Sequence, residues 1–125
     1  MNKQDVFNAA AAACKAMDDK FGKDITALDI SGISPLADYF LIVTGLNPPQ
    51  IAAMSDACGK ACAEAGLPLL RSEGAGTGWL LLDFGAVIVH IFDKDQRDFY
   101  NLERIWSDAK REDMRANDAG EALAV

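Results

Sequence analysis

One set of side chains could support acid–base or metal-assisted chemistry, namely Asp83, His90 and Asp93. A histidine near a carboxylate can act as a general base, and paired carboxylates can hold a divalent cation. A nucleophilic site would also need a serine or cysteine against the histidine, and no Gly-x-Ser-x-Gly turn precedes His90. Carboxylates are frequent in a chain with 19 Asp and Glu, so the set leaves an enzyme open as an alternative without establishing one.

Two further motifs could bind a ligand. Residues 74–78 (G-A-G-T-G) invite comparison with a phosphate-binding loop, but such a loop leads into a helix, and here a strand pattern begins at Trp79. A flexible connector is the preferred interpretation. Cys58 and Cys62 share a helix face, yet a closed zinc site needs four ligands, so we interpret both as small core residues. We predict no metal and no cofactor.

The composition limits the class of protein. The chain has 125 residues, half of them apolar, and a net charge of −7 from 12 Lys and Arg against 19 Asp and Glu. This length predicts one domain, and the charge opposes direct binding to DNA or to bulk RNA phosphate. No apolar run approaches the roughly 20 residues of a membrane span, and the N-terminus has no secretory pattern. With three cysteines in no paired spacing, we expect a reducing, cytoplasmic location and no membrane partner.

The hydrophobic pattern predicts two long helices and about five strands. The helices are expected at about 2–21 and about 48–65, the second capped by Asn47. The strands are expected at 24–30, 39–44, 69–71, 79–84 and 87–92. The expected fold class is therefore α/β, a mixed sheet with helices packed against it.

A third helical pattern starts at Asp93 and carries Phe99, Leu102 and Trp106 before polar residues take over. No internal repeat and no linker divides the chain. We expect one domain over residues 1–112, followed by a polar, flexible tail over residues 113–125.

Gly85 and Ala86 fit a two-residue hairpin turn between the last two predicted strands, which places Leu81 opposite His90. One face of the hairpin is then wholly apolar and belongs in the core. The other face combines aromatic, charged and aliphatic side chains: Trp79, Leu81, Asp83, Ile88, His90 and Phe92. This mixture is unusual for a core and predicts a binding surface or a polar pocket.

Four sequence blocks occur together in a characteristic order. They are residues 38–45 (D-Y-F-L-I-V-T-G), residues 73–74 (E-G) with 79–85 (W-L-L-L-D-F-G), residues 87–92 (V-I-V-H-I-F) and residues 97–106 (R-D-F-Y-N-L-E-R-I-W). Over roughly residues 10–109 the chain resembles the Iojap-type ribosomal silencing factors, the RsfS family. It departs from that pattern at Ala86, where an acidic residue is usual, and at Pro49; residues 116–125 are expected to have no counterpart in the family.

The resemblance implies a regulatory protein that is not an enzyme. Members of the family bind ribosomal protein fourteen of the large subunit, block joining of the small subunit and lower translation when nutrients fail. A role in large-subunit maturation is also attributed to them. Their fold resembles that of nucleotidyltransferases without the catalytic Gly-Ser and paired-aspartate motif, which this sequence also lacks. A nucleotidyltransferase-like or hydrolytic enzyme using Asp83, His90 and Asp93 is the alternative, and divalent metal binding at that site would distinguish it.

The candidate partner-binding residues combine aromatic anchors with charged neighbours. They are Trp79, Asp83, His90, Tyr100, Asp38 and Glu73. Core packing is an equal alternative for Trp79 and Tyr100, and Asp38 could instead cap or hydrogen-bond within the fold. The acidic charge would steer the chain towards a basic ribosomal protein and away from ribosomal RNA. A homodimer away from the ribosome is a further hypothesis.

Overall fold

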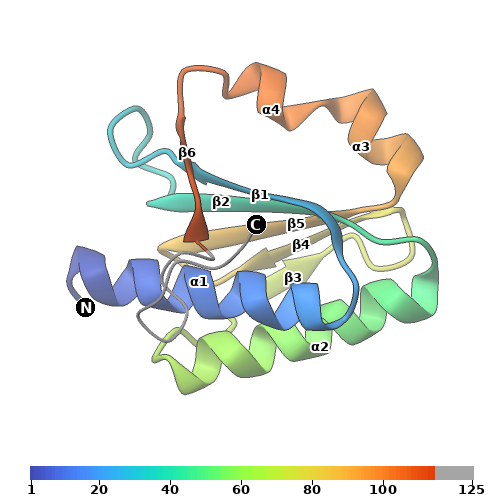
Figure 1. Cartoon of the computed structure of the whole chain (residues 1–125), viewed down its shortest axis with the longest axis horizontal. Coiled ribbons are helices and arrows are strands. Elements are labelled where there is room, and N and C mark those ends of the chain that lie inside the picture. Colours follow the sequence, from blue (N-terminus) through green and yellow to red (C-terminus); the bar gives the residue numbers. More distant parts are fainter. Residues whose placement is uncertain (115–125) are drawn as a thin grey trace.

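The backbone forms one mixed sheet between two layers of helices, as a computed structural model that describes residues 1–114 shows (Figure 1). The six strands are β1 (Lys23–Asp29), β2 (Tyr39–Thr44), β3 (Arg71–Glu73), β4 (Trp79–Asp83), β5 (Val87–Phe92) and β6 (Lys110–Glu112). Their order is β3-β4-β5-β2-β1-β6, with β2 and β5 parallel and the other neighbouring pairs antiparallel. The predicted mixed α/β class is confirmed, with six strands in place of about five.

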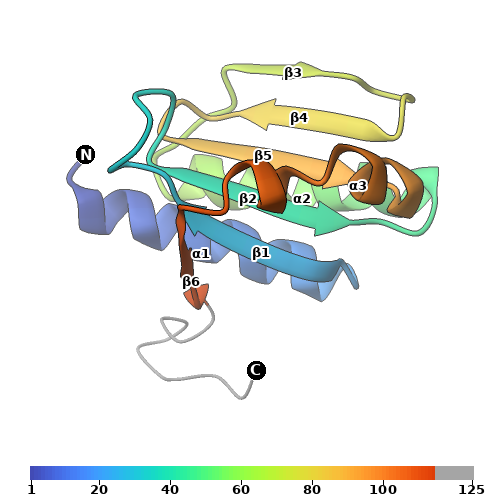
Figure 2. The ribbon, with the colours of Figure 1, turned by 90° about the horizontal axis from the view of Figure 1, so that it is seen from above.

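Two long helices, α1 (Lys3–Asp19) and α2 (Pro48–Glu64), lie side by side on one face of the sheet (Figures 1 and 2). Asn2 begins α1 with a capping box, because its side chain accepts from the Asp5 N–H and the Asp5 carboxylate accepts from the Asn2 N–H. Asn47 caps α2 by accepting from the Gln50 N–H at 2.9 Å. Both predicted helices and the predicted Asn47 cap are confirmed.

The predicted hairpin register is also confirmed, since Leu81 lies opposite His90 and the Phe84 N–H donates to the Val87 carbonyl oxygen at 2.9 Å. The apolar face of the hairpin packs on α1 and α2. All six residues of β2 are buried, and its Tyr39, Leu41 and Val43 join the apolar hairpin face and the two helices in the larger of two hydrophobic clusters. The core therefore lies between the sheet and the two long helices.

Two short helices, α3 (Lys94–Tyr100) and α4 (Leu102–Ile105), lie on the opposite face. Leu102 and Trp106 pack there against Leu28, Phe40 and Ile42 in a second, smaller cluster. The ring centroids of Trp106 and Phe40 are 5.1 Å apart. Seen from this side, the short helices lie over the middle of the sheet and leave β3 and β4 uncovered (Figure 2). No helix therefore covers the β3–β4 part of this outer face.

Both edge strands differ from expectation. The short strand predicted at 69–71 lies at Arg71–Glu73, and Leu69 and Leu70 are exposed. Its position follows from pairing with β4, where Arg71 lies opposite Asp83, and not from its own apolar residues. The strand β6 was not predicted, because its three charged residues carry no apolar signal. It pairs with the edge of β1, and Met114 beyond it is buried; the rest of the predicted tail, residues 115–125, lies outside the described residues.

The helical pattern after Asp93 is interrupted. Asn101 adopts a left-handed conformation with φ of 46°, which ends α3 and starts α4 in a new direction. Phe99, which the pattern grouped with Leu102 and Trp106, is consequently 77% exposed. No helix within residues 1–114 combines the length and the apolar character needed to cross a membrane.

Candidate functional site

The part of the outer sheet face that α3 and α4 leave uncovered is the candidate interaction site. Directly paired strand residues point their side chains to the same side of a sheet, so the β3–β4 and β4–β5 registers define this face. We call it the open face; its side chains are Arg71, Glu73, Trp79, Leu81, Asp83 and Ile88. All six are exposed or half-buried. Apolar strand residues and three charged groups are thus presented together.

Three of the predicted residues meet at one end of the open face. The Trp79 indole N–H donates to Nδ1 of His90 across the hairpin at 3.1 Å. The ring centroid of Trp79 lies 4.5 Å from that of Tyr100 and 5.1 Å from that of Phe92. We call these four residues the aromatic cluster. Tyr100, at the end of α3, is 40% exposed and Trp79 is half-buried. Each of the two therefore packs within the fold and still leaves part of its ring accessible.

His90 is the buried member of the aromatic cluster, at 4% exposure. Because Nδ1 accepts the Trp79 hydrogen bond, the proton of the neutral ring is assigned to Nε2, which is buried and has no hydrogen-bond partner among the described residues. Burial lowers the pKa of His90 from 6.5 to about 4, since the charged ring would lose its hydration. His90 is uncharged at neutral pH and acts on this face by orienting Trp79.

Two of the predicted carboxylates lie on the open face and share one arginine. Arg71 donates from Nε to Oδ2 of Asp83 at 3.1 Å and from Nη1 to Oε1 of Glu73 at 3.4 Å. Oδ1 of Asp83 accepts from the Gly85 N–H at 2.8 Å, which supports the hairpin turn. The side chains of Arg71 and Glu73 are 61% and 60% exposed, and that of Asp83 is 19% exposed. The sequence pattern did not indicate Arg71 as a site residue, because its role depends on the register of an edge strand.

Asp38 lies outside the open face. Its N–H donates to the Ala86 carbonyl oxygen at 2.8 Å, and its carbonyl oxygen accepts from the Ile30 N–H at 2.9 Å. Its backbone thereby joins the start of β2 to the β4–β5 turn and to the end of β1. That the Asp38 side chain caps or hydrogen-bonds within the fold stays a prediction. It sits at the end of the sheet that holds Asp83, away from the aromatic cluster.

The residues of the enzyme alternative do not converge. Asp83 pairs with Ile88 at the start of β5, whereas Asp93 follows Phe92 at its end. At a strand rise of ~3.3 Å per residue, the two carboxylates are separated by more than about 10 Å. Asp93 caps α3 by accepting from the Gln96 N–H at 2.8 Å. Within residues 1–114 no three His, Cys, Asp or Glu side chains are grouped to hold a metal ion.

The cysteine and glycine motifs have structural roles. Cys58 and Cys62 are fully buried in the larger cluster, as predicted. The Cys58 thiol donates to the sulfur of Cys62, and this hydrogen bond together with burial raises the pKa of Cys58. Residues 74–78 form the turn that joins β3 to β4, so they connect two strands and not a strand to a helix. The Thr77 hydroxyl donates to the Gly74 carbonyl oxygen at 2.6 Å, which closes the turn.

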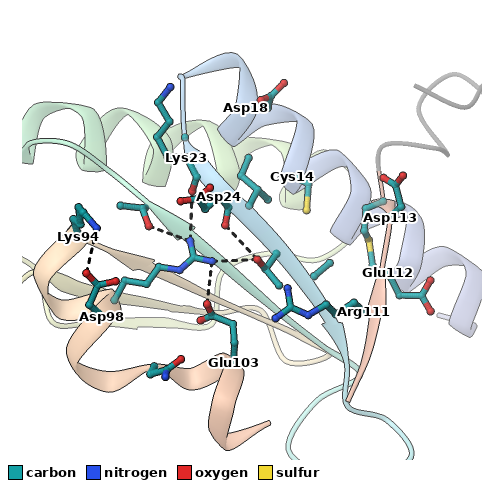
Figure 3. A pocket seen from close by; sticks show the side chains of 18 of the residues that line it. Cys14, Asp18, Lys23, Asp24, Lys94, Asp98, Glu103, Arg111, Glu112 and Asp113 are labelled. Atoms are coloured by element: carbon teal, nitrogen blue, oxygen red, sulfur yellow. Dashed lines mark hydrogen bonds and ion pairs between the residues drawn. The ribbon is translucent and has the colours of Figure 1, made fainter. Parts of the chain in front are cut away.

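A buried arginine on the same outer face escaped the sequence analysis. Arg97 is 8% exposed and donates to the hydroxyl oxygens of Thr44 at 3.0 Å and Thr26 at 3.1 Å, while its Nη2 lies 3.4 Å from Oε2 of Glu103. These contacts tie α3 and α4 to β1 and β2. They lie in a cleft of ≈ 1140 Å³ lined by side chains of both charges, into which Glu103 extends from α4 (Figure 3). Arg97 and Glu103 are the first and last residues of the R-D-F-Y-N-L-E sequence, and this oppositely charged pair was the indication of the contact that the sequence offered.

A model of the family described as ribosomal silencing factor during starvation (RsfS) matches residues 3–124 of the chain. The chain belongs to this family. The silencing factor RsfS of Bacillus subtilis (strain 168) is 44% identical over 115 residues, which cover 91% of this chain and 95% of that protein. The chloroplastic Iojap protein of Zea mays is 32% identical over 100 residues, covering 80% of this chain and 44% of that protein. A crystal structure of a Chromobacterium violaceum protein superposes with a TM-score of 0.78 at 32% identity, covering 86% of this chain and 88% of that one.

The family match confirms the resemblance found in the four sequence blocks. It identifies the chain as a ribosome-related regulator of translation. Its bacterial homologues are named ribosomal silencing factors, which describes a regulatory role and not an enzymatic one. One expectation was wrong: because the match runs to residue 124, most of residues 116–125 do have a counterpart in the family.

Proposed function

We propose that this silencing factor binds ribosomal protein fourteen of the large ribosomal subunit through the open face. By occupying that protein it excludes the small subunit and lowers translation in the cytoplasm when nutrients are limiting. One observation carries the proposal: the exposed Glu73 and the half-buried Asp83 lie on the part of the sheet that no helix covers. The partly exposed rings of Trp79 and Tyr100 lie at one end of it.

The physical properties of the open face support a basic protein as the partner. Trp79 and Tyr100 are large, oriented rings that can lose further exposed area on docking, and such residues dominate interface energies. Glu73 supplies negative charge on the same face, and Asp83 adds a carboxylate towards the other end of β4. The net charge of −7 opposes contact with ribosomal RNA and accelerates encounter with a positive protein surface. Steric exclusion needs no reaction, because covering about 800 Å² of a partner is enough for a specific complex.

Co-sedimentation with purified large subunits tests the proposal. The informative variants are Glu73→Arg and Tyr100→Ala, because both side chains are exposed and neither belongs to the two buried clusters. The matched control is Glu64→Arg, an exposed reversal of the same charge on α2 at the other face of the sheet. We expect wild type and the control to bind and to prevent joining of added small subunits, and both test variants to bind at least about tenfold more weakly.

Two outcomes would separate the site from the function. If wild type fails to sediment with large subunits at low salt, the proposed function is wrong. If wild type binds and the two test variants bind as well as Glu64→Arg, the silencing role survives and the open face is not the interface. Crosslinking from a residue of the open face to ribosomal protein fourteen identifies the partner itself.

A further inference from the structure

Resting on the proposed function, we propose that Arg71 is an internal competitor for the partner's basic side chain. In the free protein the Arg71 guanidinium already occupies the position between Asp83 and Glu73 that an arginine or lysine of a basic partner would take. Docking then requires Arg71 to leave this position. The two carboxylates are thereby held partly neutralised until a basic partner displaces the arginine.

The geometry of Arg71 supports this role. Its two contacts use different nitrogen atoms, Nε to Asp83 at 3.1 Å and Nη1 to Glu73 at 3.4 Å, so one guanidinium bridges both carboxylates. All three side chains come from paired positions of β3 and β4 on one face, with Arg71 directly opposite Asp83. A planar guanidinium with donors in two directions is therefore shown to fit between these carboxylates.

The arrangement is also easy to reverse. The side chain of Arg71 is 61% exposed and belongs to a three-residue strand at the edge of the sheet. Exposed ion pairs of this kind contribute little, typically 0–1 kcal/mol, because water competes for both groups. A basic side chain brought in by a docking protein can hence replace Arg71 without disturbing the fold, and Arg71 then turns outward to solvent or to the rim of the interface.

This partial neutralisation gives the open face selectivity between partners. A partner with no basic group at this position would have to leave Arg71 against the carboxylates, and its own apolar surface would meet a charged, hydrated side chain. A partner with an arginine or lysine exchanges one ion pair for another and keeps the carboxylates satisfied. The structure thus predicts a basic residue in the partner opposite Asp83 and Glu73, and a penalty that Arg71 imposes on every other surface.

The test compares Arg71→Gln with Lys60→Gln in binding to immobilised large subunits at low and at physiological salt. Lys60 is an exposed residue of α2 at the other face of the sheet, so its variant has the same change in net charge without touching the open face. We expect Arg71→Gln to bind about two- to fivefold more tightly than the control, the range expected for loss of competing exposed ion pairs. The gain should shrink when Glu73→Gln is added, because the two residues act on the same contact.

Each result bears on the proposal. Tighter binding by Arg71→Gln that is not shared by Lys60→Gln supports it. Equal or weaker binding overturns it, since Arg71 would then be neutral or a direct contact to the partner. If neither wild type nor Arg71→Gln binds large subunits, the proposed function and this inference both fall. Urea unfolding of both variants shows whether either substitution changes the stability of the fold. The proposal expects a change in affinity and none in stability.

Discussion

The Trp79 indole nitrogen and Nδ1 of His90 lie 3.1 Å apart, so the one histidine of the chain fixes the ring that anchors the open face. The hydrogen bond requires an unprotonated Nδ1, and burial supplies it by keeping the ring neutral. The orientation of an accessible tryptophan is thereby linked to the protonation state of a residue that a partner does not reach.

This link predicts a pH dependence of stability. The pKa of His90 is about 4 in the folded protein against 6.5 when unperturbed. Between these pH values the unfolded chain holds one proton more than the folded chain, so the free energy of unfolding falls as the pH falls. The full loss amounts to about 3 kcal/mol, with a slope of at most about 1.4 kcal/mol per pH unit. Above about pH 7 this residue contributes no slope.

Urea unfolding between pH 7 and pH 5 measures this slope, because most carboxylates have not yet begun to titrate there. The control is His90→Gln, whose amide oxygen can still accept from Trp79 but cannot titrate. We expect the variant to be flatter in this range than wild type. Identical slopes would show that the pKa of His90 is not lowered and would remove the link to Trp79.

Breaking the Arg97 network is expected to be costly. The change Arg97→Met removes the donor to Thr44 and Thr26 and leaves Glu103, whose side chain is 22% exposed, without its ion pair. Removing one partner of a buried pair costs about 3–5 kcal/mol, and the partial exposure of Glu103 places the expected loss near the lower end, at about 2–4 kcal/mol. Urea unfolding followed by tryptophan fluorescence measures it.

The matched control for this variant is Lys94→Met on the same helix. Its ion pair with Asp98 at 3.2 Å joins two exposed side chains, so the loss should stay within about 0.5 kcal/mol. A loss for Arg97→Met no larger than that for Lys94→Met would mean that the short helices are held by apolar packing alone.

Two glycines in the turn between β3 and β4 allow the cost of conformational strain to be measured separately from the cost of a steric clash. Gly74 and Gly76 have φ of 88° and 82°, so an alanine is strained at either position. A Cβ at Gly74 would collide with the Trp79 carbonyl oxygen, whereas a Cβ at Gly76 meets nothing within 4 Å. We expect Gly76→Ala to cost about 1 kcal/mol and Gly74→Ala at least about 1 kcal/mol more. Equal losses by thermal or urea unfolding would show that the turn rearranges around the added carbon.

The elements that sequence patterns predicted well are those whose burial is set by local periodicity. Strands β2 and β5 are continuous apolar runs, and α2 begins where Asn47 can cap it. The edge strands were misplaced or missed because an edge strand is defined by its neighbour. The three residues of β3 and the charged residues of β6 pair because β4 and β1 present free edges to them.

The candidate site was predicted in part for the same reason. The two-residue turn at Gly85 fixes which hairpin residues share a face, so the meeting of Trp79 with His90 followed from local rules. The roles of Arg71 and Arg97 did not, because each depends on at least one side chain from an element that is distant in the sequence. An isolated arginine in an acidic sequence gives no sign of whether it is buried against threonines or bridges two carboxylates.

Asn101 separates α3 from α4, and its conformation yields the last prediction. With φ of 46° and ψ of 58° it lies in the left-handed region, which asparagine and glycine tolerate and alanine does not. Asn101→Ala should therefore cost about 1 kcal/mol, while Asn101→Gly should stay within about 0.5 kcal/mol of wild type. If Asn101→Ala matches wild type in urea unfolding, the break between the helices is imposed by the packing of Leu102 on the sheet and not by the residue at the break.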